Sequence, residues 1–140
     1  MAIIKKTGYR IDPLDLNTRK AIGIKVPFNK KGIFEFNYTT KDQIKSNLIN
    51  LLLTSPGERF HEPTYGIGLR DQLFEQNTDN FDSKIGQLKQ LINQKIGIHI
   101  PQIRLNSLKV SPIDNTNNLL VKLSYTLLLN NETNQLSLKF

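Results

Sequence analysis

The stretch that decides the fold runs from Leu51 to Glu75 and reads LLLTSPGERFHEPTYGIGLRDQLFE. It joins the end of one predicted helix, a compact loop and the start of another helix without a spacer. The Pro-Gly pair at 56–57 turns the chain after the first helix, and Pro63 biases Glu62 away from helical backbone angles. Residues 58–65 are therefore predicted to cross the domain as an ordered loop.

An ordered loop needs hydrogen-bond partners for its backbone, and this one carries suitable polar groups. Glu58 offers a carboxylate acceptor, and Arg59 offers a fork of five donors. Gly66 and Gly68 permit a tight entry into the next helix. The loop is interpreted either as an internal brace or as a surface that faces a partner, and the two roles can coexist.

Helical periodicity is clear on both sides of this loop. Thr40 and Gln43 form a capping-box pattern at the start of a helix that ends at Ser55. A short helix is predicted over Gly68–Phe74, and a long one from about Asn80 to Ile96 with Asp79 as its cap. The faces expected to be buried are Ile44, Leu48, Leu51 and Leu52 in the first helix and Phe81, Ile85, Leu88, Ile92 and Ile96 in the long one.

Alternating apolar residues predict strands at both ends of the chain. Ile22–Val26 and Ile33–Tyr38 flank a turn at residues 29–32, which indicates a hairpin. The closing strands are predicted at Ile103–Val110, Leu119–Leu129 and Gln135–Phe140, with a loop at Asn130–Asn134. The expected fold class is α+β: a mixed or antiparallel sheet, made of the hairpin and the closing meander, with two to three helices packed on one side.

The positive charge is concentrated at the start of the chain. The net charge is +7, and residues 1–31 hold eight basic and two acidic residues, which is +6 of that total. We expect residues 1–20 to form a basic, largely irregular arm and residues 21–140 to form a single domain. Such an arm can contact nucleic acid or an acidic protein. Tyr9 and Phe28 are the only aromatic residues in the basic segment 1–31, and this scarcity of rings for base stacking disfavours nucleic acid.

Several classes of protein are excluded or disfavoured by composition. The chain has no cysteine, so it has no disulfide, thiolate nucleophile or sulfur zinc ligand. Its most apolar stretch, Leu48–Leu53, is far shorter than the ~20 residues of a membrane span. The start of the chain lacks the pattern of a signal peptide. His61 and His99 lie in different elements without metal-ligand spacing, so we expect no metal site.

The loop region also holds a cluster of acids that raises the possibility of glycoside hydrolysis. Glycosidases use paired carboxylates at a set separation, with one acid in an apolar pocket that raises its pKa. Each acid here has a basic residue nearby, so ion pairs are the simpler account and no catalytic residue is assigned. The four acids are Glu58, Glu62, Asp71 and Glu75.

The order and spacing of the loop residues resemble those of the baseplate wedge subunits of contractile phage tails. The pattern is Thr54-x-x-Gly57-Glu58-Arg59-x-x-x-Pro63-x-Tyr65-Gly66-x-x-Leu69, followed by Leu73-Phe74-Glu75. It is similar to the small wedge protein once labelled a tail lysozyme and to its counterpart in type VI secretion baseplates. The resemblance covers roughly residues 33–140 and is looser over Tyr9–Leu16.

One position departs from the family pattern. The family carries Glu-Pro-Arg and an aliphatic residue where the long helix gives way to the first closing strand, whereas this chain has Ile100-Pro101-Gln102-Ile103. A charge-assisted partner contact made there in relatives is therefore in doubt, and Arg104 could replace it only in part.

The resemblance implies a structural protein of the virion tail baseplate that is made in the host cytoplasm and needs no cofactor. It implies binding to larger wedge proteins and attachment of the first sheath ring by strand sharing, for which the closing hairpin offers an edge strand. Tube or hub proteins are further partners that the basic arm could reach. A peptidoglycan-degrading glycosidase and a nucleic-acid-binding module remain as alternatives. The residues expected to contact partners are Ile100, Pro101, Gln102, Ile103, Arg104, Leu136, Leu138 and Phe140.

Overall fold

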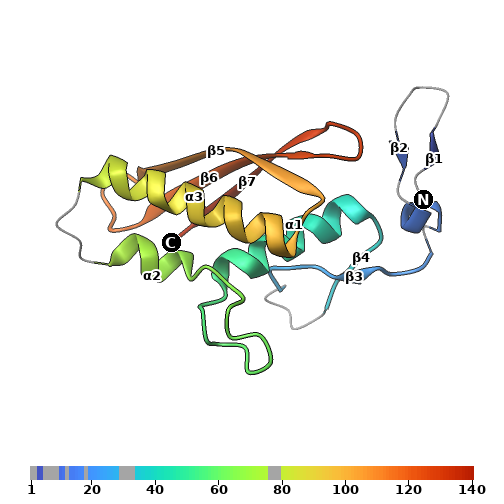
Figure 1. Ribbon diagram of the computed structural model, residues 1–140, viewed down its shortest axis with the longest axis horizontal. Coiled ribbons are helices and arrows are strands. Elements are labelled where there is room, and N and C mark those ends of the chain that lie inside the picture. Colours follow the sequence, from blue (N-terminus) through green and yellow to red (C-terminus); the bar gives the residue numbers. More distant parts are fainter. Residues whose placement is uncertain (1–2, 5–9, 12, 18, 29–33, 76–79) are drawn as a thin grey trace.

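The computed structural model describes residues 3–4, 10–11, 13–17, 19–28, 34–75 and 80–140. Helices occupy the middle of the chain and strands lie at both ends, which confirms the α+β class (Figure 1). The elements are β1 (Ile3–Ile4), β2 (Arg10–Ile11), the 3-10 helix η1 (Pro13–Leu16), β3 (Gly23–Ile24), β4 (Phe36–Asn37), α1 (Thr40–Leu53), α2 (Leu69–Phe74), α3 (Phe81–His99), β5 (Ile103–Pro112), β6 (Leu119–Leu127) and β7 (Thr133–Lys139).

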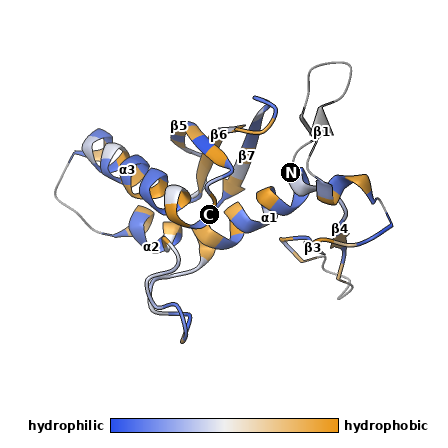
Figure 2. Ribbon diagram, turned by 45° about the vertical axis from the view of Figure 1, so that its right-hand side comes forward, coloured by the Kyte–Doolittle hydropathy of each residue, from blue (hydrophilic) through white to orange (hydrophobic). Residues whose placement is uncertain are grey.

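Strands β5, β6 and β7 form an antiparallel meander in chain order. Val110 lies opposite Val121, which in turn lies opposite Leu138, so these apolar residues share one face. A register shift at Asn106 introduces a bulge into β5. Figures 1 and 2 show α1, α2 and α3 on the same side of this sheet, as predicted.

The hairpin does not join that sheet, contrary to the single sheet predicted from the sequence. Strands β3 and β4 pair only with each other in the described residues, as do β1 and β2. The hairpin is attached to α1 instead, because the Ser46 hydroxyl accepts hydrogen bonds from the Val26 N–H at 3.1 Å and from Asn37 Nδ2 at 2.9 Å. The predicted turn at residues 29–32 lies outside the described residues.

Both long helices are capped one residue away from the predicted positions. Thr39, rather than Thr40, caps α1 and accepts a hydrogen bond from the Asp42 N–H at 3.3 Å. The Thr40 N–H instead donates to Asp15 Oδ1 at 2.6 Å, so a carboxylate from η1 lies at the start of α1. Asn80 caps α3, while the predicted cap at Asp79 lies outside the described residues.

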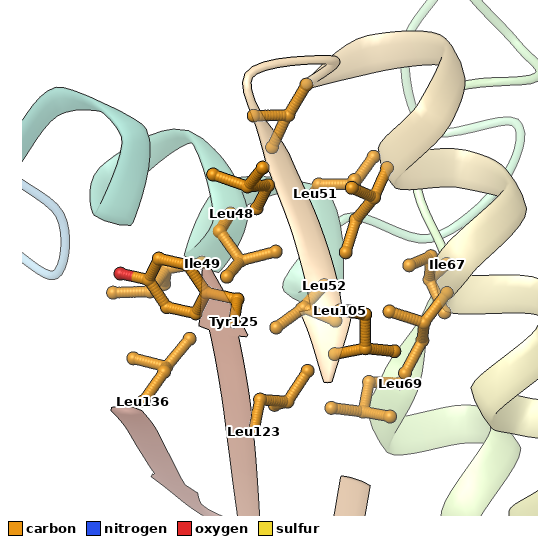
Figure 3. Packing of buried hydrophobic residues seen from close by; sticks show 14 of the residues in the cluster. Leu48, Ile49, Leu51, Leu52, Ile67, Leu69, Leu105, Leu123, Tyr125 and Leu136 are labelled. Carbon is orange, nitrogen blue, oxygen red and sulfur yellow. The ribbon is translucent and has the colours of Figure 1, made fainter. Parts of the chain in front are cut away.

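The core lies between the helices and the meander (Figure 3). All four residues predicted to form the buried face of α1 are buried, as are Leu88, Ile92 and Ile96 of α3. The prediction is wrong for Phe81, which is 45% exposed, because the first turn of α3 contributes nothing to the buried core. The largest fully covered side chains are Tyr125, Leu48, Leu51, Leu52, Ile67, Leu69, Ile92, Ile96, Leu123 and Val121.

The turn between β6 and β7 comes earlier than predicted. Strand β6 ends at Leu127 and β7 begins at Thr133, whereas the sequence predicted the loop at residues 130–134. The Leu127 N–H donates to the Glu132 carbonyl at 2.9 Å and closes the turn. Glu132 also forms an ion pair with Lys41 of α1, which ties this end of the sheet to the helix layer.

Candidate functional site

The motif loop, residues 54–68, is cross-linked at its base by backbone hydrogen bonds. The Gly57 N–H donates to the Pro63 carbonyl at 2.7 Å, which brings the two arms of the loop together. The Ser55 N–H donates to Glu58 Oε2 at 2.9 Å, so the Glu58 carboxylate satisfies a backbone group at the end of α1. These contacts hold residues 55–63 as a closed turn.

The returning arm of the loop packs against the end of α1. The Ile67 N–H donates to the Leu51 carbonyl at 3.1 Å, and the Gly68 N–H donates to the Thr54 carbonyl at 2.8 Å. Gly66 has a φ of 98°, and a Cβ atom there would overlap the Thr54 carbonyl oxygen. The close backbone approach therefore requires glycine at position 66.

Arg59 makes its contacts with side chains rather than with the backbone. Its guanidinium carbon lies 3.7 Å from the centre of the Tyr65 ring, and its Nη1 lies 3.4 Å from Glu62 Oε2. Tyr65 in turn contacts the ring of His99 edge-on, with 4.8 Å between ring centres. This stack connects the loop to the end of α3, and burial raises the pKa of the Tyr65 hydroxyl while the Arg59 charge lowers it.

The four acids of the region are all exposed to solvent. Glu58 and Glu62 accept hydrogen bonds within the loop, and Asp71 Oδ2 accepts one from the Ser55 hydroxyl at 3.0 Å. None of the four lies in the apolar pocket that would make a carboxyl group a general acid near neutral pH. Glu58, Glu62 and Asp71 therefore have the geometry of structural hydrogen bonds and ion pairs.

The described part of the chain contains neither a metal-binding cluster nor a membrane-spanning helix. No group of three or more His, Asp or Glu side chains within it is placed to hold a metal ion. Among the helices that can be described, none is long and apolar enough to cross a membrane.

The loop presents an aromatic residue that the sequence analysis did not single out. Phe60 is 93% exposed, and its ring contacts that of His61 edge-on at 5.2 Å. The loop projects away from the helices in Figure 1, and its base is closed by the hydrogen bonds described above. A large apolar side chain on an ordered projection is typical of an anchor for another protein. The sequence feature that could have identified Phe60 is its place in a loop bounded by Gly57 and Pro63.

The residues at the departure from the family pattern divide into buried and exposed groups. Ile100 is 3% exposed and Ile103 is also buried, so both belong to the core. Pro101, Gln102 and Arg104 are exposed. The Leu128 N–H donates to the Gln102 carbonyl at 2.9 Å, which connects this corner to the β6–β7 turn. A partner can therefore reach the exposed group only.

Strand β7 is an open edge of the meander. Leu119 and Phe140 exchange two backbone hydrogen bonds of 2.9 Å. Hydrogen-bonded pairs alternate with non-bonded pairs along an antiparallel ladder, so every second residue of β7 before Phe140 also bonds to β6. Leu136 and Leu138 belong to that bonded set; Leu136 is buried and Leu138 and Phe140 are half-buried. The residues whose backbone N–H and C=O groups point to the open edge are Thr133, Gln135, Ser137 and Lys139.

The other edge, along β5, is less suited to pairing. It carries the bulge at Asn106 and ends at Pro112, which has no N–H to donate. Bulges and proline are the usual features that prevent a strand from being added at an edge. Strand β7 has neither, and Lys139 is its one charged side chain that can shield the edge, so β7 is the better suited of the two edges to accept another strand.

One cavity is lined by two predicted site residues that are far apart in the sequence. Phe74 of the loop motif and Phe140 of the closing strand line a cavity of about 330 Å³. The sequence could not place them on one cavity, because that depends on where α2 and the end of the meander lie in the fold. The other lining residues are Arg70, Asp71, Asn117 and Asn118.

The chain combines a braced loop, a helix layer on one side of an antiparallel meander and an edge strand at β7. A family model described as baseplate wedge protein gp25 matches residues 39–132. The chain belongs to this family of structural baseplate proteins, which are components of virion tails. No curated protein sequence is similar enough to count as a match.

Two solved structures share the fold. One is a crystal structure of a Geobacter sulfurreducens protein named for a proposed tail-lysozyme role, with 22% identity, a TM-score of 0.61, and coverage of 73% of this chain and 90% of that one. The other is the cryo-electron microscopy structure of the anti-feeding prophage baseplate, with 19% identity, a TM-score of 0.50, and coverage of 83% and 81%. At these identities the likeness concerns the fold alone.

Proposed function

We propose that this protein is a wedge subunit that binds larger wedge proteins and provides the attachment point for the first ring of the tail sheath. The observation that carries this proposal is the open edge of β7. Main-chain groups at such an edge can pair with a strand from another chain and so extend the sheet. The incoming strand is that of the sheath protein.

The motif loop supports a role in wedge binding. Its base is closed by the bond between Gly57 and Pro63, so Phe60 is presented on an ordered support. An aromatic anchor that is already held in place loses little conformational entropy on binding. The larger wedge proteins are the partners for this surface. The exposed corner at Pro101, Gln102 and Arg104 is a second candidate contact.

The protein acts in assembly and not as an enzyme. A lysozyme-like role would need one carboxyl group in an apolar setting, whereas the four acids of the loop region are exposed and three of them accept hydrogen bonds within the fold. Purified protein should therefore not lyse peptidoglycan. Lysis that is lost in Glu58→Gln or Glu62→Gln would overturn this part of the proposal.

The basic arm has a smaller part in the proposal. Residues 1–20 are proposed as an arm ahead of the domain at 21–140, able to contact tube or hub proteins. Asp15 fixes part of this segment to the start of α1 through its bond to Thr40. Nucleic-acid binding by the arm is the alternative, and it predicts an affinity that falls steeply with salt and disappears when residues 1–20 are deleted.

The edge is tested by removing one backbone donor while β7 stays paired to β6. Ser137 directs its N–H to the open edge, so Ser137→Pro removes a donor that β6 does not use. Ser137→Ala is the matched control, because it removes the hydroxyl and keeps the N–H. Baseplates carrying Ser137→Pro should fail to nucleate sheath, and those carrying Ser137→Ala should nucleate it normally. Normal sheathed tails with a folded Ser137→Pro protein would refute strand addition at β7.

A further inference from the structure

The solvent face of the meander is cationic. Strands β5, β6 and β7 together contain four basic residues and no acidic residue. All four basic side chains are exposed, on the side of the sheet that the helices do not cover. They are Arg104, Lys109, Lys122 and Lys139.

Three of these residues are neighbours across the strands. Lys109 lies directly opposite Lys122, and Lys139 lies one diagonal step from Lys122, because Ser137 is the residue opposite it. Opposite residues have Cβ atoms about 5 Å apart and diagonal ones about 7–8 Å apart, and like charges at such positions destabilise a sheet. We call Lys109, Lys122 and Lys139 the lysine face.

The fold does not neutralise this face. The ion pairs of the described residues are Lys25–Glu35, Lys41–Glu132 and Arg59–Glu62, and none of them involves the three lysines. The chain therefore keeps an arrangement that costs stability in the free protein. Clustered like charges of this kind attract anionic groups from outside the chain.

We propose that the lysine face is a docking surface for an acidic polypeptide segment of the sheath protein. This inference rests on the proposed function, because it takes the partner to be the protein that approaches the edge of β7. Lys139 stands on that edge strand, so a strand added to β7 would lie directly beside it. Side chains alternate along a strand, so acidic residues at every second position of the added strand would face the lysines.

The chemistry of the face favours polypeptide over single-stranded nucleic acid. The other side chains on this side of the strands are hydroxyls and amides, including Ser124, Thr126 and Gln135, and an aliphatic residue, Leu120. The three strands place no aromatic side chain there on which bases could stack. Hydroxyl and amide groups suit hydrogen bonds to peptide.

Binding of a synthetic peptide tests this proposal. The probe is a fluorescent peptide of alternating Glu and Thr, compared with one of alternating Gln and Thr and with a DNA duplex. The test variant is Lys109→Gln/Lys122→Gln/Lys139→Gln. The control variant, Lys45→Gln/Arg70→Gln/Lys89→Gln, removes the same charge at exposed positions elsewhere.

The acidic peptide should bind the full chain in a salt-dependent manner. The test variant should weaken binding about tenfold, because each exposed ion pair contributes a few-fold, and the control variant should change it about twofold at most. Equal losses in both variants would overturn the proposal in favour of attraction to net charge. Tighter binding of the duplex, lost in the test variant alone, would overturn it in favour of a nucleic-acid surface.

Sheath binding by the same variants separates this inference from the proposed function. If the sheath protein binds the lysine variant with unchanged affinity and salt dependence, the inference fails and strand addition stands. If Ser137→Pro leaves sheath binding intact while the lysine variant still loses the acidic peptide, strand addition at β7 fails and the lysine face stands. A melting temperature of the lysine variant at or above that of the unmodified chain confirms that the variant is folded.

Discussion

The carbonyl oxygen of Thr54 lies 2.3 Å from the position that a Cβ atom on Gly66 would occupy, which is too close for a side chain there. The same carbonyl accepts the Gly68 N–H at 2.8 Å, so the end of α1 and the returning loop cannot separate without losing a hydrogen bond. The loop is therefore held at its base by backbone contacts, to which the Glu58 carboxylate adds a side-chain bond.

Gly66→Ala should destabilise the fold by at least about 2 kcal/mol. Alanine is strained at a φ of 98°, and its methyl group would overlap the Thr54 carbonyl. Chemical denaturation measures the change in the free energy of unfolding. The matched control is Gly86→Ala in α3, where a Cβ meets nothing within 4 Å and stability should rise by up to about 1 kcal/mol. Equal effects of the two variants would contradict the account of the loop.

Arg59→Ala should lower the free energy of unfolding by about 0.5–1.5 kcal/mol. The loss combines the contact of the guanidinium with the Tyr65 ring and a partly exposed ion pair with Glu62. A hydrogen-bonded brace in a buried site, as the sequence suggested, would cost about 1–3 kcal/mol. Glu62→Gln removes the ion pair alone and should cost less than Arg59→Ala. An unchanged melting temperature in Arg59→Ala would show that the stack does not stabilise the loop.

Ser46→Ala should detach the β3–β4 hairpin from α1. Ser46 is buried, and its loss leaves the Val26 N–H without its acceptor and Asn37 Nδ2 with one acceptor fewer, at a cost of about 1–3 kcal/mol. Limited proteolysis of the hairpin and thermal melting measure the effect. Ser83→Ala, at an exposed position of α3, should stay within about 0.5 kcal/mol of the unmodified chain. A Ser46→Ala protein as protease-resistant as Ser83→Ala would contradict this role.

The Lys41–Glu132 pair should make a small part of the stability depend on pH. The hydrogen bond from Lys41 lowers the pKa of Glu132 below its ordinary value of 4.5. Because the folded-state pKa is the lower one, this stabilisation is present above about pH 4.5 and is lost as the pH falls through the folded-state value. Glu132→Gln should therefore cost about 0.5 kcal/mol at pH 7 and nothing well below pH 4.

Denaturation at the two pH values measures that difference. Glu75→Gln is the control, since the Glu75 carboxylate belongs to no ion pair among the described residues. A cost for Glu132→Gln that is the same at both pH values would exclude the ion pair as its cause.

The sequence predicted the parts of the fold that follow from periodic burial. The apolar spacing of Ile44, Leu48 and Leu52 can be satisfied only by a helix with one covered face. The alternation of Val121, Leu123 and Tyr125 likewise requires a strand with one covered face. Both patterns are local, so they can be read without knowing what covers them.

Features that depend on tertiary packing could not be predicted in this way. Thr39 and Thr40 are equally good caps by composition, and the choice follows from Asp15 binding Thr40. Asn37 is 3% exposed because Ser46 and Gln43 satisfy its amide, and a polar residue in an alternating segment gives no sign of that. The position of the β3–β4 hairpin, which lies on α1 and does not pair with the meander, likewise depends on its hydrogen bonds to Ser46.

The candidate site was predictable in outline from the loop motif. The motif placed Gly57, Glu58 and Gly66 in one braced loop, and the structure brings them together. The exposure of Phe60 and the presence of Phe74 and Phe140 on one cavity depend on the path of the loop and on the position of α2, which no local sequence pattern predicts.

Amide hydrogen exchange along β7, with and without the sheath protein, tests the central claim most directly. The N–H groups of Gln135, Ser137 and Lys139 point to the open edge, whereas those of Leu136 and Leu138 bond to β6. The account predicts fast exchange at the three edge amides in the free protein and strong protection of the same three when the sheath protein is bound. Edge amides that continue to exchange fast in a saturated complex would contradict attachment by strand addition.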